Sequence, residues 1–165
     1  MNTPSYVLVS RVRMTDTGGQ WSFVVHPTNG DEPFEAADFE PGATRERLEL
    51  LAIVRALEAL EQPSHVTLCC ESPHLFRRIG QGLDEWRDAG WQWEAFGEMV
   101  PIANADLWRR VDRAIRIHKV ECRRTPPAFR QPFAGVNERL QNPLRRPNPA
   151  SLPRVNMHRQ LAATA

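Results

Sequence analysis

The feature that most constrains the fold is a predicted amphipathic helix at residues 45–60, which follows three predicted strands. Its sequence, RERLELLAIVRALEAL, places apolar residues at the three- and four-residue spacing of one helix face. Thr44 precedes the helix and is a predicted N-cap. The strands at 6–12, 20–27 and 34–37 are separated by short turns, a pattern typical of antiparallel pairing. The helix must therefore cover a sheet that begins as an antiparallel meander.

The second half of the chain alternates single strands with helices. The sequence predicts a strand at 66–70, followed by one or two short helices between 71 and 91 that break near Gly80 and Gly82. A loop at 94–103 is predicted next. A helix at 104–118, capped by Asn104, and a strand at 119–124 complete this half. Alternation of this kind is typical of βαβ crossovers, in which the strands are parallel. The predicted fold is therefore α/β, with a mixed five-stranded sheet of three antiparallel strands and then parallel strands, flanked by helices.

Charge divides the chain into two parts. Residues 1–124 carry 15 basic and 19 acidic side chains, whereas residues 125–165 carry six arginines and one glutamate. Half of the 14 prolines also lie in the second part, where a short helix at 136–140 is the last predicted element. We therefore expect a domain at 5–124 and a basic, Pro/Arg-rich tail at 125–165 that is largely disordered.

The basic tail is a candidate for binding a polyanion. Arginine forks bind phosphates, and short basic tails bind nucleic acid with a strong salt dependence. Arg145 and Arg146 are the paired arginines of this tail and are predicted nucleic-acid contacts. The alternative is a solvated tail with no ligand.

Composition excludes two other classes of protein. No apolar run approaches the length of about 18 residues that a membrane helix needs, and the start MNTPSY has no signal-peptide core. Three cysteines without C-x-x-C spacing favour a reduced, cytoplasmic protein that does not act at a membrane. Nothing in the sequence specifies an oligomeric state.

Glu49 interrupts the apolar face of the helix at 45–60. At 100° per residue, Ile53, Ala56 and Leu60 lie within about 40° of it. A carboxylate at the edge of a core is costly unless it is solvated, paired or bound to a metal. One interpretation is that Glu49 reaches water near the start of the helix and pairs with Arg45. The other is that it is a metal ligand, working or inherited.

Four motifs occur in a fixed order: RERLELLAIVRALEAL, VTLCCES, GW and NADLWRRVDRAI. Together they resemble bacterial ribonuclease H of the first type, over residues 6–124. The resemblance implies a ribonuclease H-like fold and hydrolysis of the RNA strand of RNA–DNA hybrids. In that family, four carboxylates hold two divalent ions, which activate water and stabilise the leaving oxygen. Carboxylate oxygens suit hard cations such as magnesium.

Two of the four implied carboxylates are present. Glu49 stands at the position of the helix carboxylate, and Glu71 stands where the family has an aspartate after the fourth strand. Ser10 occupies the position of the first-strand aspartate, and Gln141 that of the last-helix aspartate. The resemblance therefore implies weak metal binding by Glu49 and Glu71. Arg11 follows Ser10, and strand alternation predicts that its side chain points to the opposite face of the sheet.

The resemblance also bears on the binding surface. Thr44 and Arg45, at the start of the helix, are predicted nucleic-acid contacts. In many bacterial members the region corresponding to 82–91 is a basic protrusion that grips the hybrid, but here it carries three acids and one arginine. Trp86 and Trp91 in this region are predicted to pack in the core.

Three functions remain open from the sequence. The first is a catalytically impaired ribonuclease H relative that binds nucleic acid or protein, with no cofactor. The second is an active magnesium- or manganese-dependent endonuclease that cuts RNA–DNA hybrids and recruits another acid, for which Asp16 and Asp112 are the first candidates. The third is a structural protein that binds no nucleic acid.

Overall fold

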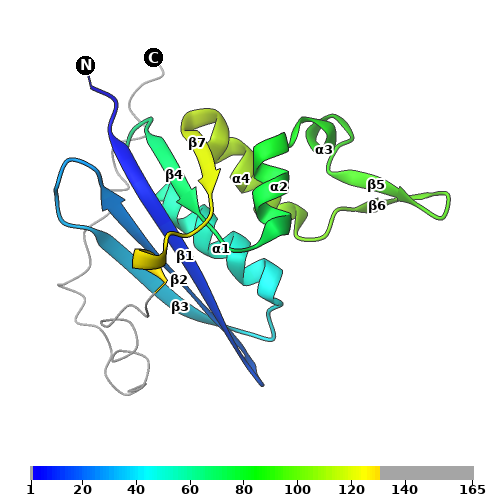
Figure 1. The fold of residues 1–165 in the computed structure, drawn as a ribbon. Helices are drawn as coiled ribbons and strands as arrows, with labels where there is room; N and C mark the ends of the chain where they lie inside the picture. The colour runs from blue at the N-terminus through cyan, green and yellow to red at the C-terminus, as the bar shows by residue number, and fades with distance from the viewer. Residues whose placement is uncertain (1, 131–165) are drawn as a thin grey trace, which may run out of the picture. The chain divides into compact units, whose positions relative to one another are not determined.

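The computed structural model describes residues 2–130, and a five-stranded sheet forms its centre (Figure 1). The elements are, in chain order, β1 (Ser5–Thr15), β2 (Gly18–Pro27), β3 (Phe34–Pro41), α1 (Arg45–Glu58), β4 (His65–Cys69), α2 (Pro73–Gln81), α3 (Asp84–Asp88), β5 (Gln92–Ala95), β6 (Glu98–Pro101), α4 (Ala105–Ile117), β7 (Lys119–Arg123) and the 3-10 helix η1 (Pro127–Phe129). The helix predicted at 136–140 lies outside the described residues.

The strand order of the large sheet is β3-β2-β1-β4-β7. β1 pairs antiparallel with β2 and parallel with β4, and β4 pairs parallel with β7. Pairing between β1 and β4 ends at Val9 and Cys69, whereas β1 continues along β2 as far as Thr15. Ser10 and Cys70 therefore stand side by side at the point where the two parallel strands part. The predicted mixed sheet is confirmed.

Helix α1 lies against the sheet because its apolar face is nearly continuous. Leu48, Ile53 and Leu57 are among its buried residues, and α1 packs against β1, β2 and α4. At one point the helix comes so close that β2 needs a glycine: a Cβ atom on Gly19 would lie 2.3 Å from Cδ1 of Leu48. Thr44 caps α1 as predicted, since its hydroxyl accepts a hydrogen bond from the backbone N–H of Arg47 at 3.3 Å.

The core continues between α1, α4 and the α2–α3 region. Trp108 of α4 is fully buried, and its ring meets that of Trp86 edge-on at a centroid distance of 5.2 Å. Trp91 is buried and Trp86 is half-buried against the same core, which confirms the prediction for these two side chains. None of the helices in residues 2–130 is both long and apolar enough to cross a membrane.

One local prediction is wrong, and a second is confirmed only in part. The predicted loop at 94–103 contains most of a hairpin, formed by β5 and β6 around the tight turn Phe96–Gly97. The sequence lacks the Asn-Gly or Asp-Gly signal of such a turn, so the pattern did not predict it. Asn104 is the N-cap residue of α4 as predicted, with φ of 56°, but its side chain makes no capping hydrogen bond. Its side chain bonds to Arg47 of α1 instead.

Candidate functional site

A cavity of about 250 Å³ lies where β1, α1 and the end of β4 meet the segment that follows β7. Ser10 belongs to β1 and Glu49 to α1, and Glu71 is the second residue after the end of β4. All three side chains belong to the lining of this one cavity. The structure thus brings together residues that are 39 and 22 positions apart in the chain, because the two strands part beside the start of α1.

Glu49 is half-buried in this lining, between the fully buried Leu48 and Leu50. Burial raises the pKa of its carboxyl group, and a hydrogen bond from the Ser72 side chain offsets part of that rise. The positive charge of Arg45 also lowers the pKa of Glu49 from a distance, but no ion pair joins the two side chains among the interactions of the described residues. Glu49 is therefore held by Ser72 rather than paired with Arg45.

Glu71 stands in a different environment. Its side chain is 72% exposed, and one carboxylate oxygen lies 3.9 Å from Nε of Arg130. Arg11 is close enough for Glu71 to raise the pKa of its guanidinium, although burial has the larger effect and lowers that pKa. Both arginines line the cavity. Glu71 therefore faces cations supplied by the protein itself.

The prediction that Arg11 points to the opposite face of the sheet from Ser10 is confirmed. Leu8 and Val12, which share the face of Ser10 on β1, pack against the core, whereas Arg11 shares its face with His26 of β2. Both Ser10 and Arg11 nevertheless line the cavity. Arg11 donates a hydrogen bond to the carbonyl oxygen of Phe129, in the segment after β7. The cavity is lined by residues from both faces of β1 here, at the point where β4 no longer pairs beside the strand. The Phe129 ring in turn meets His26 of β2, with 5.0 Å between the ring centroids. Residues 125–130 thus cross back over β1 and β2.

The charges of the cavity do not fit a pair of divalent ions. Its lining holds two carboxylates, Glu49 and Glu71, and three guanidiniums, Arg11, Arg45 and Arg130. Within residues 2–130, no group of three or more His, Cys, Asp or Glu side chains is placed to hold a metal ion. Magnesium needs several oxygen ligands, and neighbouring guanidiniums repel it. The described residues therefore offer at most a weak site for one ion.

Neither candidate for a further acid reaches this cavity. Asp16 is exposed in the turn between β1 and β2. Asp112 is buried on α4, where Arg87 donates to both of its carboxylate oxygens, at 3.0 and 2.5 Å, and Arg116 lies 3.2 Å away. Asp112 is therefore a structural ion-pair partner in this fold.

The Asp112 ion pairs predict a pH dependence of stability. Hydrogen bonding by Arg87 lowers the pKa of Asp112 in the folded protein below its ordinary value of 3.8. A carboxyl group whose pKa is lower in the folded than in the unfolded protein stabilises the fold above about pH 4. This stabilisation is lost as the pH falls through the folded pKa. We expect Asp112→Asn to destabilise the protein more at pH 6 than at pH 2.5. Urea unfolding at both pH values measures this, with the exposed Asp16→Asn as control; equal losses at both pH values would contradict it.

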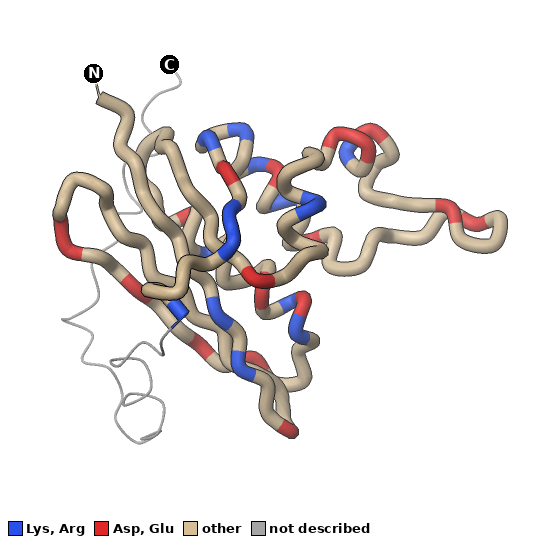
Figure 2. The backbone as a smooth tube through the Cα atoms, viewed as in Figure 1, with Lys and Arg blue, Asp and Glu red and all other residues tan. Residues whose placement is uncertain are grey.

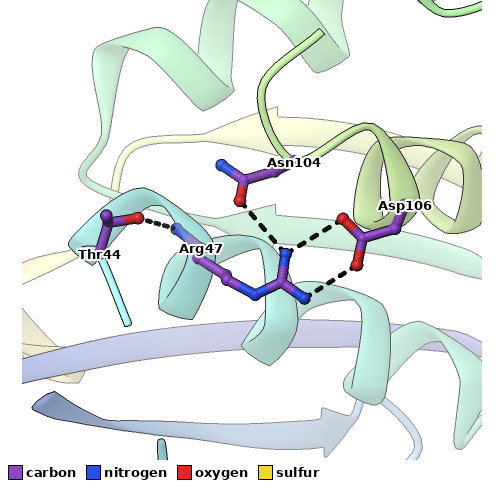
Figure 3. A network of polar contacts seen from close by, with 4 residues as sticks. All are labelled: Thr44, Arg47, Asn104 and Asp106. Atoms are coloured by element: carbon purple, nitrogen blue, oxygen red, sulfur yellow. Dashed lines mark hydrogen bonds and ion pairs between the residues drawn. The ribbon is translucent and has the colours of Figure 1, made fainter. Parts of the chain in front are cut away.

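Arg47 is a residue of this region that the sequence patterns did not identify (Figure 3). Its guanidinium binds both carboxylate oxygens of Asp106, at 3.1 and 2.8 Å, and the Asn104 side-chain oxygen at 3.3 Å. These bonds join the start of α1 to the start of α4. They hold the first turns of α1, from which Arg45 and Glu49 project.

A second cavity, of about 650 Å³, adjoins the first between α2 and the segment after β7. It shares Glu71, Ser72 and Arg130 with the first cavity and adds Arg77 and Arg124. Sequence patterns missed this group, since its arginines lie on separate elements. Of the remaining predicted site residues, Arg45 lines the first cavity and Thr44 caps α1. Gln141, Arg145 and Arg146 lie outside the described residues.

Comparison with known proteins identifies the fold and the family. A sequence profile of the RNase H family matches residues 10–126. The chain belongs to the ribonuclease H family. The ribonuclease HI of Caulobacter vibrioides is 33% identical over 132 residues, which cover 79% of this chain and 85% of that relative. The ribonuclease H of Novosphingobium aromaticivorans is 40% identical over 92 residues, and the match covers 56% of this chain.

For some of the relatives, the match covers less than two thirds of the relative's own length. The chain spans 62% of the length of the Novosphingobium ribonuclease H, and 65% of a Rhodopirellula baltica ribonuclease H to which it is 28% identical. Among solved structures, one similar to this chain is LC9-RNase H1, described as a type 1 RNase H with the type 2 active-site motif. It superposes with a TM-score of 0.61 and is 18% identical in sequence. The superposition covers 78% of this chain and 66% of LC9-RNase H1. This likeness confirms the predicted ribonuclease H-like fold.

Proposed function

We propose that this ribonuclease H family protein binds nucleic acid through arginines and hydrolyses RNA–DNA hybrids poorly. The observation that carries the proposal is the lining of the first cavity, in which three guanidiniums accompany two carboxylates and Ser10 stands on β1. A serine hydroxyl is a neutral and weak ligand for a hard cation. Two bound ions are the means by which this family polarises and cleaves a phosphodiester, so their loss removes most of the catalysis.

Guanidinium groups supply the positive charge that metal ions would otherwise supply. Arg45, Arg77 and Arg124 are exposed and line the two adjoining cavities. Planar guanidiniums bind phosphate oxygens in pairs and need no metal for this. The arginines of the C-terminal residues, including Arg145 and Arg146, add sequence-independent attraction for a polyanion. The proposed ligand is therefore a nucleic acid bound without divalent ions.

A second candidate function is a working hybrid endonuclease that uses magnesium or manganese. It is favoured by the curated relatives, which are named ribonuclease H, and by a solved relative, LC11-RNase H1, that was crystallised with an RNA/DNA hybrid. In that case the missing ligands come from residues beyond 130. The two functions predict different effects of divalent ions: the endonuclease needs them to bind and cleave the hybrid, whereas the arginine-based binding does not need them.

Binding to a fluorescent 18-base-pair RNA–DNA hybrid tests the proposal. We expect the full chain to bind in EDTA as well as in magnesium. Arg45→Gln and Arg124→Gln should each weaken binding and lower the slope of log K against log salt by about 1, because each removes one phosphate contact. Arg113→Gln, an exposed arginine of α4, is the matched control. Fluorescence anisotropy at several salt concentrations measures these changes.

Deleting residues 132–165 separates the two sources of positive charge. The deletion removes five arginines and should reduce the salt slope further, and the remaining affinity should still depend on Arg45 and Arg124. Binding that vanishes in EDTA, together with rapid hybrid cleavage in magnesium, would instead establish the endonuclease.

A further inference from the structure

The β5–β6 hairpin displays apolar side chains that no part of residues 2–130 covers. Trp93 is 55% exposed, Met99 56% and Phe96 fully exposed. These are three of the seven large exposed hydrophobic side chains of the described residues, and they lie within seven positions of each other. β5 and β6 pair with each other and form a sheet separate from the large one (Figure 1). The hairpin thus displays one exposed apolar side chain on each of its two faces, Trp93 and Met99, and a third, Phe96, at its tip.

The base of the hairpin is anchored, so its tip is held out in a defined position. Trp91 and Ile102 flank the two strands and are both buried in the core. The backbone N–H of Trp91 bonds to the carbonyl of Trp86 at 2.7 Å, and that of Ile102 to the carbonyl of Trp91 at 3.0 Å. An isolated two-stranded hairpin is marginally stable in water. Here the buried base stabilises it.

Phe96 occupies a backbone conformation that disfavours it. Its φ is 52°, and that of Gly97 is 85°, as in a tight turn that usually selects Asn or Gly at both positions. A bulky aromatic residue in this conformation is rare, and such residues concentrate at functional sites. Phe96 gains no burial in exchange, because its side chain is fully exposed. Turn formation therefore does not explain the choice of phenylalanine.

The charge around the hairpin selects the kind of partner. Residues 84–101, which include α3 and the hairpin, carry five acidic side chains and one basic side chain, Arg87 (Figure 2). Arg87 is already paired with Asp112 and Asp84. The acidic surface of residues 84–101 repels the phosphates of nucleic acids and anionic lipid headgroups, and two copies of the hairpin repel each other. The same acidic surface attracts a basic surface of a partner.

We propose that the β5–β6 hairpin docks into a partner protein whose surface presents an apolar pocket bordered by arginine or lysine side chains. Phe96 enters the pocket, and Trp93 and Met99 contact its walls. Glu94 and Glu98, on the same two strands, face the basic border. Exposed aromatic anchors surrounded by complementary charge are the usual hot spots of protein interfaces.

The test uses a 12-residue random peptide library displayed on phage, with the full-length chain as bait. We expect a class of peptides rich in arginine or lysine together with leucine, isoleucine or phenylalanine, whose affinity for the chain is measured by isothermal titration calorimetry. Phe96→Asn should lower that affinity at least about tenfold, as expected for a hot-spot residue. Because asparagine suits the turn, this variant should remain as stable as the parent.

Two further variants make the result specific. Glu94→Lys combined with Glu98→Lys should also lower the affinity at least about tenfold, because it reverses the charge beside the apolar tip. Phe39→Asn, at an exposed phenylalanine of β3, should leave the affinity unchanged. If no selected peptide depends on Phe96, or if those that do are acidic, the proposal is overturned. A Phe96-dependent dimer in sedimentation velocity would overturn it in favour of a second copy.

Discussion

Replacing Ser10 with aspartate and Gln141 with aspartate is expected to raise hybrid cleavage in magnesium by about 10²- to 10³-fold over the parent chain. Lewis-acid stabilisation by a bound metal contributes several kcal/mol, and each 1.4 kcal/mol corresponds to a factor of about ten. An aspartate at position 10 would face Glu49 and Glu71 across the first cavity. Glu71 is one methylene longer than the aspartate of the family, so recovery should be partial. Cleavage of a labelled hybrid by the purified proteins measures the gain.

Matched variants separate charge from shape in this experiment. Ser10→Asn combined with Gln141→Asp has the size of the aspartate variant without its charge, and should recover little activity. Adding Glu49→Gln to the double aspartate variant should abolish the gain, because the half-buried carboxylate is a required ligand. Rapid cleavage by the unmodified chain that disappears in Glu49→Gln would contradict the whole interpretation. The parent would then possess a complete metal site.

Trp108→Ala is expected to destabilise the fold by about 3–5 kcal/mol, the range for removal of a large buried aromatic side chain. Trp108 is completely buried on α4. Its ring contacts Trp86 edge-on at 5.2 Å and lies 6.4 Å from the ring of His74, so one side chain joins α4 to α2 and α3. The cavity left by alanine cannot be filled by these neighbours without moving the helices. Guanidinium unfolding followed by circular dichroism measures the loss.

Trp93→Ala is the matched control for this prediction. It removes the same atoms from a side chain that is 55% exposed on β5, and should change the free energy of unfolding by about 0.5 kcal/mol or less. Similar losses for both variants would show that Trp108 is not a centre of the core. Because Trp93 also belongs to the proposed docking surface, its variant should be stable yet deficient in partner binding.

The order and type of the main elements could be predicted from the sequence. Residues 45–60 carry an unambiguous helical period, and α1 is observed at Arg45–Glu58. Short apolar runs bounded by turn residues predicted the five strands of the sheet, and their spacing predicted which pairs are parallel. These properties depend on near neighbours in the chain. The sequence therefore determined them by itself.

A local pattern identified one acid of the candidate site, and the family resemblance identified the other. Glu49 stands out because it interrupts an apolar face, whereas Glu71 was identified by its match to the ribonuclease H aspartate position. The sequence pattern did not predict the β5–β6 hairpin, because Phe96 is a poor turn residue and no local signal marks the turn. Where a residue contradicts its local preference, the sequence pattern predicts the wrong structure.

The tertiary structure alone decided the charge of the site. Arg11 and the carbonyl of Phe129 that it binds are 118 residues apart, and Arg130 meets Glu71 from the segment after the last strand. Strand alternation predicted the face of Arg11 correctly, but it could not predict that the cavity reaches Arg11 at the point where β4 ends beside β1. Long-range pairing brings these guanidiniums beside the carboxylates. Electrostatic balance depends on distances in space, and these distances follow from the packing of the whole domain.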